Sequence, residues 1–185
     1  MSHVDKELKK YGISLVLSVS NVFIDTSRVG GYFDDYNKQL VVYFDECFLD
    51  VLVHEFCHFK QWKEDCKVWR ELGDSLDLMW KWLRHEIELD KQTLNFIFEA
   101  VSNLEKDCER RAVKLIKKYD LEIDLEKYIR SANTYLHFYD YVKEHRVWMK
   151  EEQGIESFVQ VLSEVDCKEV KKSNPNIYKL FDYYF

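Results

Sequence analysis

One segment, residues 48–63, constrains the fold most, because it is apolar on nearly every side and still carries two histidines and a glutamate. It contains neither proline nor glycine, so we expect one uninterrupted helix over the whole segment. A helix that is apolar all round is buried in the protein. The polar side chains inside it, His54, Glu55 and His58, must therefore find partners in the interior.

These three residues form the pattern His-Glu-x-x-His. Residues four apart on a helix lie on the same face, so His54 and His58 can bind one metal ion. The chain has 6 histidines in 185 residues, and its composition gives roughly 0.02 chance matches to this pattern. Two buried histidines that are hydrogen-bonded to the backbone or to carboxylates are the alternative. The pattern favours a zinc site, with Glu55 beside it as a candidate general base.

Length and composition predict a single domain over residues 1–185. The chain has a single proline, 5 glycines and 46% hydrophobic residues, which leaves no flexible linker and excludes a disordered chain. The formal net charge of -7 disfavours a general nucleic-acid binder or a protein of anionic membranes, because both need a basic face. We therefore expect neither nucleic acid nor membrane as a partner.

Several features predict a cytoplasmic protein, or one of the host cytoplasm if the chain is viral. The N-terminus has no basic stretch followed by an apolar one, and no apolar run approaches membrane-spanning length. The five cysteines are an odd number, widely scattered and without a C-x-x-C pair. This pattern indicates reduced thiols.

The first quarter of the chain has the period of β-strands. Apolar residues alternate from Ile13 to about Ile24, and residues 32–36 and 39–44 flank Asn37-Lys38, which is typical of a tight hairpin turn. We expect a small, largely antiparallel sheet here, ahead of the helix at 48–63.

Helical periodicity dominates from residue 65 onward. We expect a stop at Gly73 and a helix cap at residue 74 or 75. Further helices are expected over about 90–119, from a cap at 124 to about 146, and over about 155–165. The predicted class is therefore α+β, with a small N-terminal sheet packed on the helix at 48–63 and a mostly helical C-terminal part.

A zinc ion bound by His54 and His58 needs a third protein ligand. The apolar stripe of the helix at 90–119 provides a criterion, because Glu105 lies roughly 40° from the centre of this stripe and Glu109 roughly 80°. We therefore expect Glu105 to face the core and to be the third ligand. The alternatives are Glu109, Cys108, Cys66, His85, His137 and His145.

The pentapeptide at His54, preceded by a hairpin and followed far downstream by a helical glutamate, resembles the zincin metallopeptidases. It is most similar to the gluzincin type, in which a glutamate is the third ligand. A fuller pattern is similar to small uncharacterised metallopeptidase-like proteins of tailed bacteriophages: Glu105-x-x-Cys108-Glu109-x-Arg111, then Tyr128-Ile129-x-x-x-Asn133-x-Tyr135. The resemblance also implies an antiparallel edge strand beside the active helix, which residues 39–44 would supply.

The resemblance implies a zinc-dependent hydrolase that cleaves a peptide or protein substrate, with Glu55 as the general base and Glu105 as the third ligand. Four further residues are candidates for orienting the ligands or stabilising the transition state: Glu109, Arg111, Tyr135 and Tyr139. A second hypothesis is a catalytically inactive protein-interaction module of zincin fold with a structural zinc. It is motivated by the absence of an Asn-Glu-x-x-Asp motif around Glu105 and by the aromatic tail.

Overall fold

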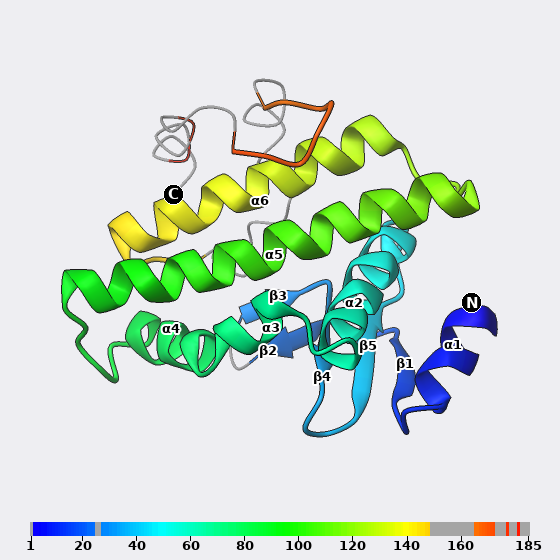
Figure 1. Ribbon diagram of the computed structural model, residues 1–185, viewed down its shortest axis with the longest axis horizontal. Helices are drawn as coiled ribbons and strands as arrows, with labels where there is room; N and C mark the ends of the chain where they lie inside the picture. Colours follow the sequence, from blue (N-terminus) through cyan, green and yellow to red (C-terminus); the bar gives the residue numbers. More distant parts are fainter. Residues whose placement is uncertain (1, 25–26, 149–164, 173–176, 178–180, 182–185) are drawn as a thin grey trace.

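The computed structural model describes residues 2–24, 27–148 and 165–172, together with Ile177 and Phe181. These residues form an α+β fold, as the sequence predicts, with a small N-terminal sheet and a mostly helical remainder (Figure 1). The elements along the chain are α1 (Ser2–Lys9), β1 (Ser14–Ser18), β2 (Val22–Ile24), β3 (Ser27–Val29), β4 (Gly31–Asp34), β5 (Gln39–Tyr43), α2 (Phe48–Lys63), α3 (Lys67–Leu72), α4 (Ser75–Leu83), α5 (Lys91–Tyr119) and α6 (Leu125–His145).

The main sheet has the strand order β1-β5-β4, so the expectation that residues 39–44 supply an edge strand was wrong: β5 is the central strand, with a neighbour on each side. The β4–β5 hairpin is antiparallel, as predicted, and the side chain of Asp34 accepts hydrogen bonds from the amides of Tyr36 and Asn37 in its turn. The sheet is mixed rather than antiparallel throughout, because β1 pairs with β5 in parallel. The β2–β3 pair and β4 lie between β1 and β5 in the chain.

The first quarter of the chain contains a helix as well as strands, although only strands were predicted there. Residues 2–9 form the helix α1, which carries an ion pair between Lys9 and Asp5, one turn apart, at 2.7 Å. The strand-like alternation begins only at Ile13, after Gly12 has turned the chain with a φ of 71°. Leu8 and Ile13 are both buried and join the helix to the sheet.

The other helices agree closely with the prediction. Helix α2 spans residues 48–63, Gly73 ends α3, and α5 and α6 begin after Asp90 and Asp124. Both aspartates accept hydrogen bonds from amides of the first helical turn, which is the function of an N-cap. The helix predicted at about 155–165 and most of the aromatic tail lie outside the described residues.

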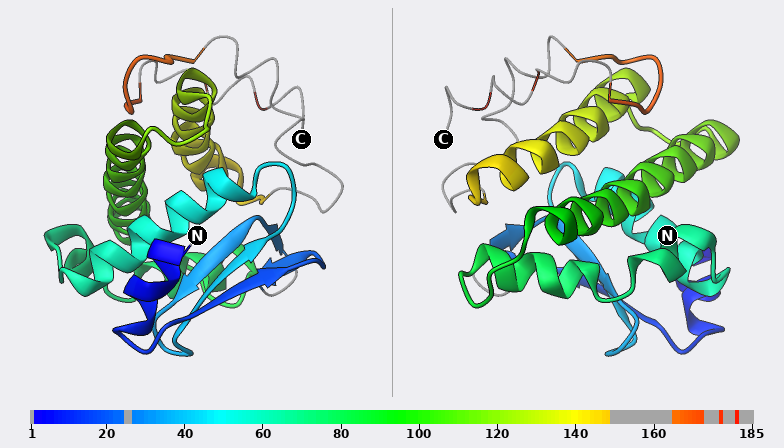
Figure 2. Two further views of the ribbon diagram at one scale, coloured as in Figure 1. Left: turned by 90° about the vertical axis from the view of Figure 1, so that its right-hand side faces the viewer. Right: turned by 60° about the vertical axis from the view of Figure 1, so that its left-hand side comes forward.

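Helix α2 lies between the sheet and α5, and this explains its apolar surface (Figures 1 and 2). One face packs against the sheet through Leu52, Phe56 and Phe59. The neighbouring face packs against α5 through Val53 and Cys57. Both faces are thus removed from water, which leaves a narrow strip of the helix for the histidines.

Gly31 allows β4 to run close to α2. A Cβ at this position would lie 2.5 Å from the carbonyl oxygen of Val41, 2.8 Å from a methyl carbon of Val51 and 3.3 Å from Cγ of Glu55. The first distance is too short for any side chain and involves rigid backbone. The start of β4 is therefore held against the residue pair Val51 and Glu55.

Among the described residues, no helix is both long and apolar enough to cross a lipid bilayer.

Candidate metal centre

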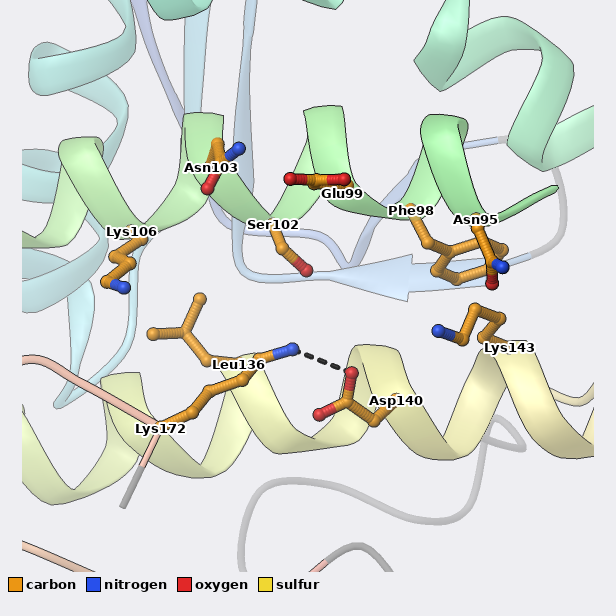
Figure 3. A pocket seen from close by; sticks show the side chains of 10 residues that line it. All are labelled: Asn95, Phe98, Glu99, Ser102, Asn103, Lys106, Leu136, Asp140, Lys143 and Lys172. Atoms are coloured by element: carbon orange, nitrogen blue, oxygen red, sulfur yellow. Dashed lines mark hydrogen bonds and ion pairs between the residues drawn. The ribbon is translucent and has the colours of Figure 1, made fainter. Parts of the chain in front are cut away.

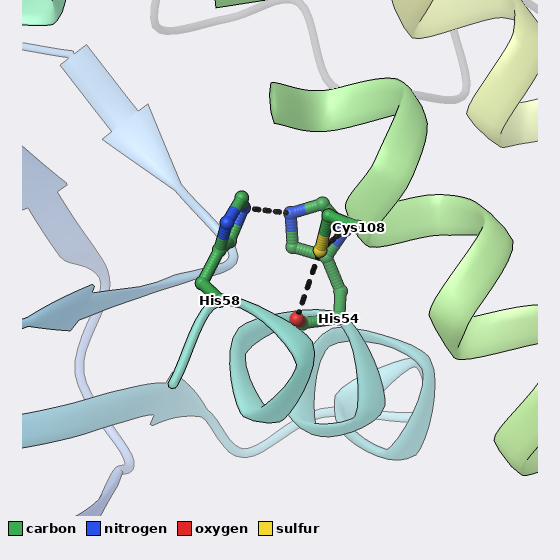
Figure 4. Close-up of side chains that lie close together, drawn as sticks. All are labelled: His54, His58 and Cys108. Carbon is green, nitrogen blue, oxygen red and sulfur yellow. Dashed lines mark hydrogen bonds between the residues drawn. The ribbon is translucent and has the colours of Figure 1, made fainter. Parts of the chain in front are cut away.

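The two histidines of the motif face each other from α2 (Figure 4). Their Nε2 atoms are 3.1 Å apart, and the ring planes are nearly perpendicular, at 81°. In each ring the other nitrogen, Nδ1, has a separate partner: Glu109 for His54 at 3.0 Å, and Gln61 for His58 at 2.9 Å. A contact at Nδ1 thus orients each ring, and the two Nε2 atoms are directed to a common point.

Glu109 orients His54. One carboxylate oxygen of Glu109 contacts His54 Nδ1, and the other accepts a hydrogen bond of 2.6 Å from the hydroxyl of Tyr128. A carboxylate only accepts hydrogen bonds, so Nδ1 of His54 carries the proton of this contact. Burial alone would lower the pKa of His54, but the nearby carboxylates, above all Glu109, raise it well above its usual value.

Glu105 approaches both histidines from α5. Its Oε2 atom is 3.5 Å from Nε2 of His54 and 3.6 Å from Nε2 of His58. Burial would raise the pKa of Glu105, but the two imidazoles lower it below its usual value. The side chains of His54 and Glu105 are 21% and 18% exposed, so both are largely buried.

Cys108 also lies beside this point, one turn of α5 after Glu105 (Figure 4). Donor atoms of His54, His58 and Cys108 all lie within 4.8 Å of one another, and these residues, called the metal group below, could hold a metal ion. The thiol, however, donates a hydrogen bond of 3.2 Å to the carbonyl oxygen of His54. Burial raises the pKa of the Cys108 thiol well above its usual value, which favours the protonated form.

Glu55 is the third polar residue of the motif and is 7% exposed. Burial raises its pKa above the usual value, although the charges of His54 and His58 oppose the shift. Its Cγ lies beside Gly31, so the side chain is placed between α2 and the start of β4. The charges of His54 and His58 act on Glu55, so its carboxyl group lies close to the two histidines.

The remaining predicted residues surround the site at different distances. Arg111 pairs with Asp107 and Glu64 and contacts neither histidine. Tyr135 and Tyr139 lie on α6; burial first, and then the charge of Glu105, raise the pKa of both hydroxyls, that of Tyr135 to about 12. Within the described residues, the remaining ligand candidates join no metal-binding group: His85, His137, His145 and Cys66.

Two residues with structural importance at the site had no predicted role. Tyr128 donates to Glu109, and Gln61 contacts His58 and is fully buried. Gln61 is three residues after His58, so helical periodicity alone places the two on neighbouring faces. An uncharged polar residue inside an otherwise apolar helix was the available signal, because such a group needs a buried partner.

A groove lies between α5 and α6, away from His54 and His58 (Figure 3). It has a volume of about 460 Å³, and its lining includes neither motif histidine nor Glu105 or Cys108. Its charges have both signs, and Lys172 and Asp140 form an ion pair of 2.7 Å on its α6 side. We assign no ligand to this groove, since no field of one sign develops in it.

Comparisons with protein-family models, with curated proteins and with solved structures found no match to the chain. The residues of the metal group and their geometry are therefore the basis on which a function is proposed.

Proposed function

We propose that this protein is a zinc-dependent metallopeptidase in which His54, His58 and Glu105 bind the metal. The observation that carries the proposal is the convergence of three donor atoms, whose separations are 3.1, 3.5 and 3.6 Å. Ligands about 2 Å from a tetrahedral zinc ion lie roughly 3.3 Å from one another. The spacing of the three atoms is therefore close to that of three ligands of such an ion, which would leave a fourth position for water or substrate.

The hydrogen bonds at Nδ1 of the two histidines support a cation between their Nε2 atoms and Glu105. Glu109 accepts a hydrogen bond from the Nδ1–H of His54, so a neutral His54 presents a lone pair at Nε2. His58 is oriented in the same way by Gln61. Two lone pairs and a carboxylate oxygen that face one another repel unless a proton or a metal ion lies between them. Neutral imidazoles with a second partner at Nδ1 are the usual form of zinc-binding histidine.

Glu105 fits the third position better than Cys108 does. Oε2 of Glu105 is almost equally distant from both Nε2 atoms. The sulfur of Cys108 instead donates to the carbonyl oxygen of His54 and lies 3.8 Å from Nδ1 of that ring, on the side already occupied by Glu109. A zinc thiolate would require Cys108 to lose its proton and turn away from that carbonyl.

The surrounding residues suit hydrolysis of a peptide bond. A bound zinc ion would act as a Lewis acid that activates water and polarises a carbonyl group. Glu55 accepts the proton of the attacking water and delivers it to the leaving amine. Tyr139 on α6, whose hydroxyl interacts with the charges of Glu105 and Glu55, is the candidate donor of a hydrogen bond to the oxygen on which negative charge would develop. Glu109 and Tyr128 hold His54 in position throughout.

Zinc content and cleavage of a peptide library test the proposal together. We expect one zinc ion per chain in protein purified without chelators, and peptide cleavage that a chelator abolishes and added zinc restores. The absence of bound metal would refute the proposal. Tight zinc binding without cleavage of any peptide would instead support an inactive interaction module with a structural zinc.

The affinity for zinc is expected to fall as the pH falls. The imidazoles must lose their protons to bind the metal, and the pKa values of His54 and His58 are raised above 6.5 in the metal-free protein. Protons therefore begin to displace the metal above pH 6.5, at about a tenfold loss of affinity per pH unit for each proton taken up. Competition with a chromophoric chelator between pH 8 and pH 6 measures the slope, and a flat profile would contradict this expectation.

A further inference from the structure

Gln61 connects one histidine of the site to the helix that carries Glu105. Its side chain is fully buried on α2, one turn after His58. The amide oxygen Oε1 is 2.9 Å from Nδ1 of His58. The amide nitrogen Nε2 donates to the carbonyl oxygen of Leu104 at 3.0 Å and to Oδ2 of Asp107 at 2.9 Å. Leu104 directly precedes Glu105, so a single side chain joins His58 to the backbone next to the third ligand.

The partners of Gln61 determine the orientation of its amide. A backbone carbonyl and a carboxylate only accept hydrogen bonds, so the group that faces Leu104 and Asp107 must be the NH₂ group. Both of its protons are then used, and the oxygen must face His58. Nδ1 of His58 therefore carries a proton in this contact, and the lone pair of the neutral ring lies at Nε2, toward His54 and Glu105.

Asp107 is in turn held by Arg111, which donates from Nε at 2.6 Å and also pairs with Glu64, at the end of α2. The chain of contacts thus begins at His58, crosses to α5 at Leu104 and Asp107, and returns to α2 at Glu64. It links the two helices independently of any metal.

We propose that Gln61 is a positioning residue for the metal site, an inference that rests on the proposed function. Gln61 selects the tautomer of His58 in which Nε2 is free to bind zinc. It also ties α2 to α5 beside Glu105, so that the donor atoms lie at tetrahedral spacing before the metal arrives. Loss of such a partner behind a metal ligand typically reduces metal affinity by about 10–100-fold.

The variant Gln61→Met tests this role, because methionine has a similar volume but neither accepts from His58 nor donates to Leu104. Asn133→Leu is the matched control. Asn133 is also a fully buried amide, and it donates to the carbonyl oxygens of Asp166 and Glu169 at 2.8 Å, away from the metal group. We expect both variants to lower the melting temperature of the metal-free protein. We expect only Gln61→Met to weaken zinc binding, by about 10–100-fold.

The tautomer of His58 provides a second measurement that needs no variant. Long-range ¹H–¹⁵N NMR of metal-free wild-type protein, at alkaline pH where the ring is neutral, should show the proton at Nδ1. A proton at Nε2, or zinc binding by Gln61→Met with wild-type affinity, would overturn the role of Gln61 and leave the zinc site standing. Failure of the wild-type protein to bind zinc would overturn the proposed function, and the proposed role with it.

Discussion

Glu55→Gln is expected to reduce peptide cleavage by about 10²–10⁴-fold, the usual contribution of a general base, while zinc remains bound. Glutamine has nearly the volume of glutamate but does not take up the proton of water at neutral pH. Glu55 is buried beside His54 and His58, and its role in the proposed mechanism is proton transfer rather than metal binding. The measurements are kcat/KM on a peptide selected from the library and the zinc content of the same sample.

The control for this experiment is Glu71→Gln. Glu71 lies on α3, where its side chain is 56% exposed and forms only a surface pair with Lys67 at 3.5 Å. Its cleavage rate should match that of the wild-type protein, because exposed pairs contribute little to stability. Equal rates for wild-type protein and Glu55→Gln would exclude Glu55 as the base. A loss of zinc from Glu55→Gln would instead indicate that the residue supports the metal.

Glu105→Gln is expected to weaken zinc binding by more than about 100-fold, since loss of a group that only orients a ligand already costs 10–100-fold. The substitution keeps the size of the side chain but removes the negative charge that faces both Nε2 atoms. Competition with a chelator measures the affinity. The melting temperature with and without zinc reports the same loss, because zinc at about 1,000 times its Kd stabilises a folded protein by about 4 kcal/mol.

Two further variants make this result specific. Glu99→Gln removes an exposed carboxylate from the same helix, at the groove between α5 and α6, and should leave zinc affinity unchanged. Cys108→Ala removes the other donor near the histidines and should retain one zinc ion per chain. Should Cys108→Ala lose zinc while Glu105→Gln keeps it, Cys108 and not Glu105 would be the third ligand.

Local sequence signals accounted for most of the fold. Helix α2 begins and ends at the predicted residues, and Asp90 and Asp124 cap the two long helices. These features depend on neighbouring residues, through periodicity and capping, and are therefore readable from the sequence. The parallel pairing of β1 with β5 was not predicted, because the partner of a strand depends on the path of the chain between them.

The candidate site divides in the same way. The spacing of His54 and His58 within one helix determined that two imidazoles would share a face, and the phase of the apolar stripe indicated Glu105 among many acidic residues. The phase gave the wrong order of burial, because the side chain of Glu109 is 11% exposed and that of Glu105 is 18% exposed. Only the tertiary structure decided how these groups meet, since Glu105, Glu109 and Gln61 reach the site across the contact between α2 and α5. Helical phase determines the direction in which a side chain points. The distance and the hydrogen-bond partner follow from how two helices pack, and no local pattern encodes that packing.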